Sequence, residues 1–210
     1  MMQQSIRKNG LMLFAFALMM AAVLAFTHEG TKEKIDESER KAAKKALLEI
    51  IPQSRIDNDI LTDTIELPEE ARKQLGIDDS NNTVYIARKN NQVVAVIIPA
   101  TAPDGYSGDI KLLAGINTDG TIAGVRVLAH KETPGLGDKI DLRKNNWITS
   151  FNGRSLDNPA SNGWQVKKDG GEFDQFTGAT ITPRAVVRRV HSILKVVDDN
   201  QTLLFKTSSK

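Results

Sequence analysis

An uncharged apolar run from Gly10 to Thr27 is the feature that most constrains how this chain folds. As a helix, its 18 residues extend over about 27 Å, the short end of what spans a bilayer. Arg7 and Lys8 precede the run, and positively charged flanks stay on the cytoplasmic side of a membrane. The pattern therefore predicts a single-pass anchor at residues 10–27, with residues 1–9 cytoplasmic and residues 28–210 outside.

The alternative for this run is a cleaved signal peptide. The run is long for that purpose, and no small-x-small cleavage site stands at its end.

A second, amphipathic helix is expected from Thr31 to Ile51, where Pro52 would stop it. We expect residues 28–82 to form a helical and irregular segment, with a short helix from Pro68 to Leu75 that Gly76 ends.

Charge and composition exclude several classes of function. The chain carries a net charge of +2, and both excess charges precede the apolar run, so residues 28–210 are balanced. A nucleic-acid-binding face would need a clustered basic excess. The absence of cysteine excludes thiolate ligation of an iron–sulfur cluster and a cysteine nucleophile. The three histidines are scattered, which argues against a metal site.

Two hairpins are predicted in the middle of the chain. The first pairs residues 83–88 with residues 92–99 around Asn90-Asn91, and the second pairs residues 110–116 with residues 121–130 around residues 117–120. Pro103 to Gly108 forms a glycine-rich turn between them. These strands predict a mainly antiparallel sheet flanked by helices, and hence an α+β fold.

The clearest amphipathic helix follows the segment Asp174–Pro183. Its apolar face carries Val186, Val187, Val190, Leu194 and Val197. We expect Thr182 to be its N-cap and Pro183 its first residue. Thr180 would then lie just before a helix N-terminus, where free backbone N–H groups favour an anion. An ordinary capped turn is the alternative.

Three short motifs resemble one family. Asp174-x-x-Thr177-Gly178-Ala179-Thr180 resembles the flavinylation motif of the FMN-binding domain in the Rnf and Na⁺-pumping NADH:quinone oxidoreductase families. Glu132-Thr133-Pro134-Gly135-Leu136-Gly137 resembles a second signature, and Asp104-Gly105-Tyr106-x-Gly108 a third. Their order, together with the apolar N-terminus, is most similar to the G subunits of Rnf-type complexes. The C subunit of the Na⁺-pumping NADH:quinone oxidoreductases is the alternative within the family.

The resemblance implies a covalent flavoprotein. FMN would be attached by a phosphoester bond to Thr180, moved there from FAD by a flavin transferase. The cofactor-binding residues would also include Asp174, Thr177, Gly178, Ala179, Glu132, Thr133, Pro134, Gly135, Leu136 and Gly137. The FMN-binding domain would occupy residues 83–200, followed by a tail at residues 201–210. No catalytic residue and no metal ligand are expected.

The implied function is electron transfer in an ion-translocating, NADH- and ferredoxin-linked complex of the bacterial inner membrane. The domain would lie on the periplasmic side, and its partners would be the other membrane subunits. A flavin-free anchoring and docking subunit is one alternative, and a membrane-tethered reductase acting alone is another.

Two expectations concern the surroundings of the flavin. Five aromatic residues are expected to support a pocket for the ring, with core packing as the alternative: Trp147, Phe151, Trp164, Phe173 and Phe176. The loop Glu132–Gly137 is expected to pack against the flavin, with a plain link to a helix at residues 138–143 as the alternative. Near the ring, the charge of Glu132 would lower the flavin potential.

Overall fold

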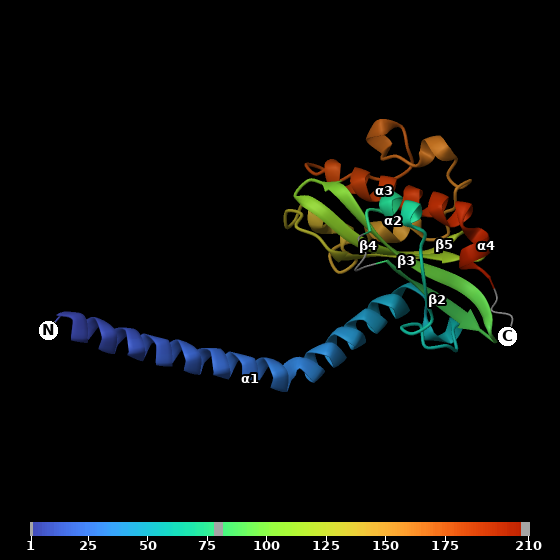
Figure 1. Ribbon diagram of the computed structural model, residues 1–210. Helices are drawn as coiled ribbons and strands as arrows, with labels where there is room; N and C mark the ends of the chain where they lie inside the picture. Colours follow the sequence, from blue (N-terminus) through green and yellow to red (C-terminus); the bar gives the residue numbers. More distant parts are fainter. Residues whose placement is uncertain (1, 78–81, 207–210) are drawn as a thin grey trace. The chain divides into compact units, whose positions relative to one another are not determined.

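The computed structural model of the protein describes residues 2–77 and 82–206. The chain divides into two compact units, residues 1–43 and residues 44–210. The last four residues of the expected C-terminal tail, 207–210, lie outside the described residues. Figure 1 labels the α-helices and strands β2 to β5.

One helix replaces the two that were predicted at the N-terminus. Helix α1 runs without interruption from Met2 to Ile50, so the separate helices expected at residues 10–27 and 31–51 are continuous. Only residues 28–30 lie between the two patterns, and the single glycine among them costs a helix about 1 kcal/mol, too little to end it. Within the described part of the chain, no helix combines the length and the apolar character needed to cross a membrane.

A five-stranded antiparallel meander forms the centre of the second unit, in the order β1-β2-β3-β4-β5. The strands are β1 Thr64–Glu66, β2 Thr83–Lys89, β3 Gln92–Gly105, β4 Gly108–Asn117 and β5 Ile122–Ala129. The predicted hairpins are confirmed. Asn90 and Asn91 turn the first with φ of 52° and 62°, and Gly120 turns the second with φ of 80°.

Strand β3 is longer than predicted because Pro99 does not end it. Its pairing with β2 reaches only Ile97, whereas its pairing with β4 continues to Gly105. Beyond Ile97 one edge of β3 therefore has no strand partner, and the missing N–H of a proline is tolerated at a free edge. The glycine-rich turn accordingly shrinks to Tyr106 and Ser107.

Helices α2 (Glu69–Leu75) and α3 (Ile181–Asp199) cover one face of the sheet, and the short α4 (Gln201–Leu204) follows α3 (Figure 1). They enclose the larger hydrophobic core with alternate residues of the strands. Gly76 ends α2 in the left-handed conformation, as predicted. A smaller core on the other face joins Leu47, Ile50 and Ile51 to Ile97 and Leu113.

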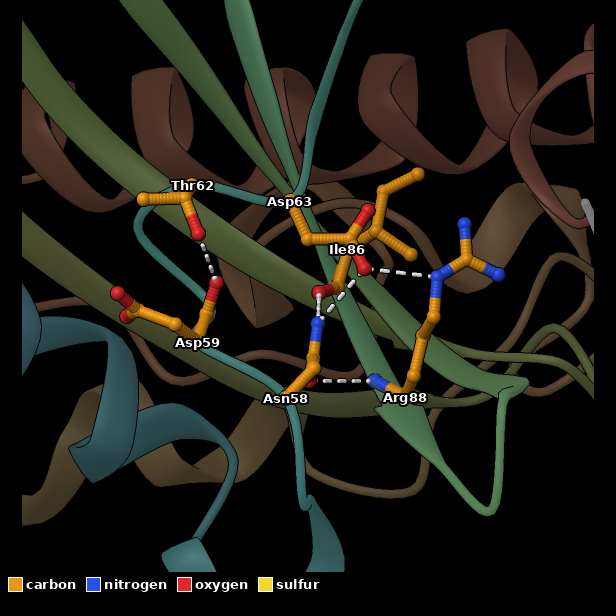
Figure 2. Close-up of polar contacts among 6 residues, drawn as sticks. All are labelled: Asn58, Asp59, Thr62, Asp63, Ile86 and Arg88. Atoms are coloured by element: carbon orange, nitrogen blue, oxygen red, sulfur yellow. Dashed lines mark hydrogen bonds and ion pairs between the residues drawn. The ribbon is translucent and has the colours of Figure 1, made fainter.

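A polar network holds the segment after α1 against strand β2 (Figure 2). The Asn58 side chain donates to the Asp63 carboxylate at 2.8 Å and to Ile86 O at 2.9 Å, and it accepts from the Arg88 N–H at 2.9 Å. Arg88 Nε pairs with the same Asp63 carboxylate at 2.7 Å. The buried Arg88 is thus balanced by a carboxylate, which is the condition under which a protein tolerates a buried charge.

The connection from β5 to α3 contains neither a strand nor an α-helix. It forms four 3-10 helices, at Gly137–Ile140, Asn146–Phe151, Ser161–Gly163 and Lys167–Asp169. The predicted helix at residues 138–143 is therefore a shorter 3-10 turn. Long connections of this kind usually have a function of their own.

Candidate functional site

Thr180 occupies the N-cap of α3, one residue before Ile181. The prediction that Thr182 is the N-cap is therefore wrong: Thr182 is the second residue of the helix and is fully buried. Gly178 has a φ of 80°, a left-handed conformation that glycine adopts without strain, and the Ala179 N–H closes the turn on Phe176 O at 3.1 Å. This turn places Thr180 at the start of the helix.

The Thr180 hydroxyl makes no capping hydrogen bond, although it occupies the capping position. Among the described residues, no group accepts from the backbone N–H of Ile181 or Thr182, and Pro183 has no N–H to donate. The first turn of a 19-residue helix thus presents free donors beside a free hydroxyl. Such a turn favours a negatively charged group through its N–H groups and the helix dipole.

A cavity of about 310 Å³ lies beside this turn. Three segments far apart in the sequence line it: the β3–β4 turn, the loop after β5 and the start of α3. The lining residues are Tyr106, Glu132, Thr133, Leu136, Gly137, Gly178, Ala179 and Thr182. The structure therefore brings together the three segments that the motifs singled out.

The loop Glu132–Gly137 folds around one carbonyl group. Thr133 O accepts from the N–H groups of Leu136 and Gly137 at 3.1 Å, and Gly135 adopts a φ of 77°. The Leu136 side chain is 41% exposed, and a methyl group built at Gly178 would lie 3.7 Å from its Cδ2 atom. The loop thus lies against the turn that precedes Thr180.

Glu132 is buried, with 4% of its surface exposed, and both of its carboxylate oxygens are engaged. Oε1 accepts from the Ser107 N–H at 2.9 Å, and Oε2 accepts a short hydrogen bond from the Thr182 hydroxyl. Methyl groups built at Gly105 and Gly137 would lie 2.9 Å from Oε1 and 2.8 Å from Oε2. A methyl group at Gly105 would also meet Gly108 O. One at Gly137 would lie 2.8 Å from the Thr182 hydroxyl oxygen, so both glycines allow close packing around the carboxylate.

The polar residues of the motif, Asp174, Thr177 and Thr180, are not among the residues that line the cavity, although Gly178 and Ala179, directly before Thr180, are. The Asp174 carboxylate pairs with Lys167 Nζ at 2.6 Å, and both side chains are largely exposed. The Asp174 carbonyl accepts from Trp147 Nε1 at 2.7 Å, which anchors the start of the motif to the connection before it. Thr177 is exposed on the turn. Both side chains are accessible to a partner protein from outside.

The prediction that the five aromatic residues form a ring-binding pocket is wrong. They are at most 8% exposed, belong to the larger core and contact one another, with Phe151 and Phe173 centroids 4.7 Å apart and Trp147 and Phe176 centroids 5.2 Å apart. The aromatic residue that lines the cavity is Tyr106, which is 68% exposed. The feature of the sequence that identifies Tyr106 is its place in the Asp104-Gly105-Tyr106 motif.

Two ion pairs flank the site on α3. Arg184 binds Asp169 through two hydrogen bonds of 2.6 and 2.8 Å, and these lower the pKa of the Asp169 carboxyl. Arg188, one turn further along, pairs with Asp104. Among the side chains that the structure describes, no group of three or more histidines and carboxylates is placed to hold a metal ion.

Comparison with known proteins identifies relatives of nearly the same length. Residues 105–195 match the family model of the FMN-binding domain, and residues 1–50 match that of the RnfG N-terminal region. The chain is 49% identical over 202 residues to the G subunit of the ion-translocating oxidoreductase complex of Pseudomonas aeruginosa (strain UCBPP-PA14), covering 96% of this chain and 93% of that protein. It is 48% identical to the G subunit of the same complex in Vibrio vulnificus (strain YJ016), with 95% and 93% covered.

Proposed function

Because this chain belongs to the family of G subunits of ion-translocating oxidoreductase complexes, we propose that its FMN is held covalently on Thr180. The bond would be a phosphoester to the threonine hydroxyl. The protein is a flavoprotein component of such a complex, and electrons would pass through this one flavin.

The observation that carries the proposal is the free hydroxyl of Thr180 at the N-cap of α3. A phosphoester keeps a negative charge, and the unpaired N–H groups of Ile181 and Thr182 supply donors for it. The small residues Gly178 and Ala179 leave the adjoining cavity open. The start of α3, the Thr180 hydroxyl and the adjoining cavity together therefore fit a phosphate ester of a large ring compound.

The side chains around the cavity suit a flavin. Tyr106 and Leu136 offer exposed apolar surface on two of its sides, and the loop Thr133–Gly137 offers backbone groups. A bound flavin supplies one- and two-electron chemistry, and the protein supplies attachment, orientation and electrostatics. The chain's own residues would hold the phosphate, shape the cavity and keep the ring accessible to the other proteins of the complex.

Maturation of the site would require a flavin transferase. Asp174 and Thr177 lie outside the cavity but on the surface beside Thr180, which suits recognition by such an enzyme. In this proposal the transferase moves FMN from FAD to the Thr180 oxygen: a new P–O bond forms, the pyrophosphate bond of FAD breaks, and AMP leaves. Thr180 would act once, as the acceptor.

We place the N-terminal part of α1 in the bacterial inner membrane, as a single-pass anchor at residues 10–27. The large apolar side chains described between Leu11 and Leu24 are exposed, and a bilayer core would cover them. Arg7 precedes them and favours a cytoplasmic N-terminus. Residues 28–210 would then be periplasmic and would meet the other membrane subunits there.

The topology makes a direct prediction. A reporter enzyme that is active only outside the cytoplasm, fused after Lys210, should be active, and the same reporter fused before Met1 should be silent. Cell fractionation of the fusions controls for expression. The reverse pattern from well-expressed fusions would contradict the orientation.

The proposed flavin attachment is tested on the whole chain, purified in detergent after co-expression with a flavin transferase. Intact mass spectrometry should show the addition of one FMN with loss of one water, and the denatured band should fluoresce in a gel. Protein made without the transferase is the control. A chain that stays unmodified in both preparations would instead support a flavin-free docking subunit.

A further inference from the structure

We propose that Glu132 is a positioning residue, which fixes the first turn of α3 so that the Thr180 hydroxyl stays free for the flavin phosphate. This inference rests on the proposed attachment at Thr180. It gives Glu132 a role that differs from a charge acting on the flavin ring. We call Glu132, Ser107 and Thr182 the Glu132 clamp.

The Glu132 clamp connects the three segments that line the cavity. Glu132 begins the loop after β5, Ser107 lies in the β3–β4 turn, and Thr182 lies in the first turn of α3. Each carboxylate oxygen binds a different one of the other two segments. One buried side chain therefore sets the distance between the loop, the turn and the helix start.

The shape of the protein around this carboxylate is specific. Gly105 and Gly137 approach its two oxygens so closely that a methyl group at either position would meet it. Thr182 is 0% exposed, so its hydroxyl is directed into the protein and away from solvent. The oxygens of Glu132 are thus occupied by protein donors, which assigns the residue to the framework of the site.

The clamp lies beside an N-cap hydroxyl that makes no capping bond. An N-cap side chain normally accepts from the second or third N–H of its helix. The third residue of α3 is Pro183, which has no N–H, and the Thr180 hydroxyl makes no capping bond. The Glu132 carboxylate contacts this turn through the Thr182 hydroxyl, while the backbone N–H groups of Ile181 and Thr182 have no acceptor among the described residues. Thr180 is left available as an acceptor.

Thr182→Val tests the clamp, because valine keeps the shape of threonine and removes the hydroxyl. The readout is the rate at which a purified flavin transferase, supplied with FAD, attaches flavin to the full-length protein in detergent. We expect the kcat of attachment to fall about 10- to 100-fold, the cost of a reacting group displaced by about an ångström, with an unchanged KM for FAD. Thr182→Ser keeps the hydroxyl and should restore most of the rate.

Ser192→Ala is the matched control, since it also removes a hydroxyl from α3 but one that binds only Arg188 O of the same helix. Circular dichroism shows whether each variant is folded. If Thr182→Val does not fold, Glu132→Gln replaces it, because glutamine keeps the size of the side chain and removes its charge. It too should lower the attachment rate.

The outcomes separate the two proposals. A wild-type protein that accepts no flavin would overturn the proposed function, and the clamp with it. A wild-type protein and a folded Thr182→Val protein that accept flavin at the same rate would overturn the clamp alone. A lower melting temperature with an unchanged attachment rate would also overturn it, because the contact would then serve only stability.

Discussion

The Thr180→Ala protein is expected to fold normally and to carry no covalent flavin. Thr180 is half-buried at the N-cap of α3, and its hydroxyl makes no capping bond. Its removal should therefore change the free energy of unfolding by no more than about 0.5 kcal/mol, as for a surface substitution. Its flavin content should fall to zero, because no other hydroxyl occupies this position.

Thr177→Ala is the matched control for this prediction. Thr177 belongs to the same motif, but it is exposed on the turn, whereas Thr180 is half-buried at the N-cap of α3. We expect this variant to retain covalent flavin at a lower yield if the transferase reads the motif. In-gel fluorescence and intact mass decide between the two threonines. Covalent flavin on Thr180→Ala would mean that the acceptor is misassigned.

Local patterns in the sequence predicted much of the fold. Asparagine pairs and Asp-Gly turns favour hairpins wherever they occur, so the turns at Asn90-Asn91 and Asp119-Gly120 were readable without the structure. The end of α2 at Gly76 has the same local cause. The uninterrupted α1 and the long β3 depart from the prediction, because one glycine costs a helix too little to end it and a proline is tolerated at the free edge of β3.

The site was predictable in its segments but not in its contacts. The motifs placed Thr180, Gly178 and the loop Glu132–Gly137 in one site, and the cavity contains residues of each segment. The hydrogen bond from Thr182 to Glu132 joins residues 50 positions apart, and no periodicity or spacing reports such a pair. Tyr106 is different, because its motif is readable in the sequence, although its place at the cavity depends on where a hairpin turn folds.

The effect of Glu132 on the flavin potential stays a prediction, and the fold adds a second expectation for this residue. From the sequence alone, an acidic residue in a flavin-binding loop predicts a negative charge beside the flavin ring. In the fold, its carboxylate is buried and receives hydrogen bonds from Ser107 and Thr182. These two neutral donors stabilise the carboxylate by hydrogen bonding, so its removal should first loosen the site. The flavin potential of Glu132→Gln therefore has to be compared among molecules that have fully attached flavin.

The largest loss of stability is expected from Phe151→Ala. Phe151 is fully buried and lies between the rings of Trp147, Trp164 and Phe173, at centroid distances of 5.3, 6.3 and 4.7 Å. Removing such a ring typically lowers the free energy of unfolding by about 3–5 kcal/mol, because apolar surface is no longer buried and a cavity is left behind. Whole domains are stable by only about 5–15 kcal/mol, so the variant should be close to unfolding at growth temperature.

This substitution separates a core function of the aromatic cluster from a flavin-binding one. Chemical denaturation followed by circular dichroism should give a much lower unfolding midpoint for Phe151→Ala, and the decrease in the midpoint should be as large in protein without flavin as in protein with it.

Tyr106→Ala is the opposite case, because an exposed side chain at the cavity contributes little to stability but would contact a bound ring. It should leave the midpoint unchanged and shift the visible spectrum of the flavin. If Phe151→Ala shifted the spectrum without lowering the midpoint, the cluster would belong to the flavin site after all.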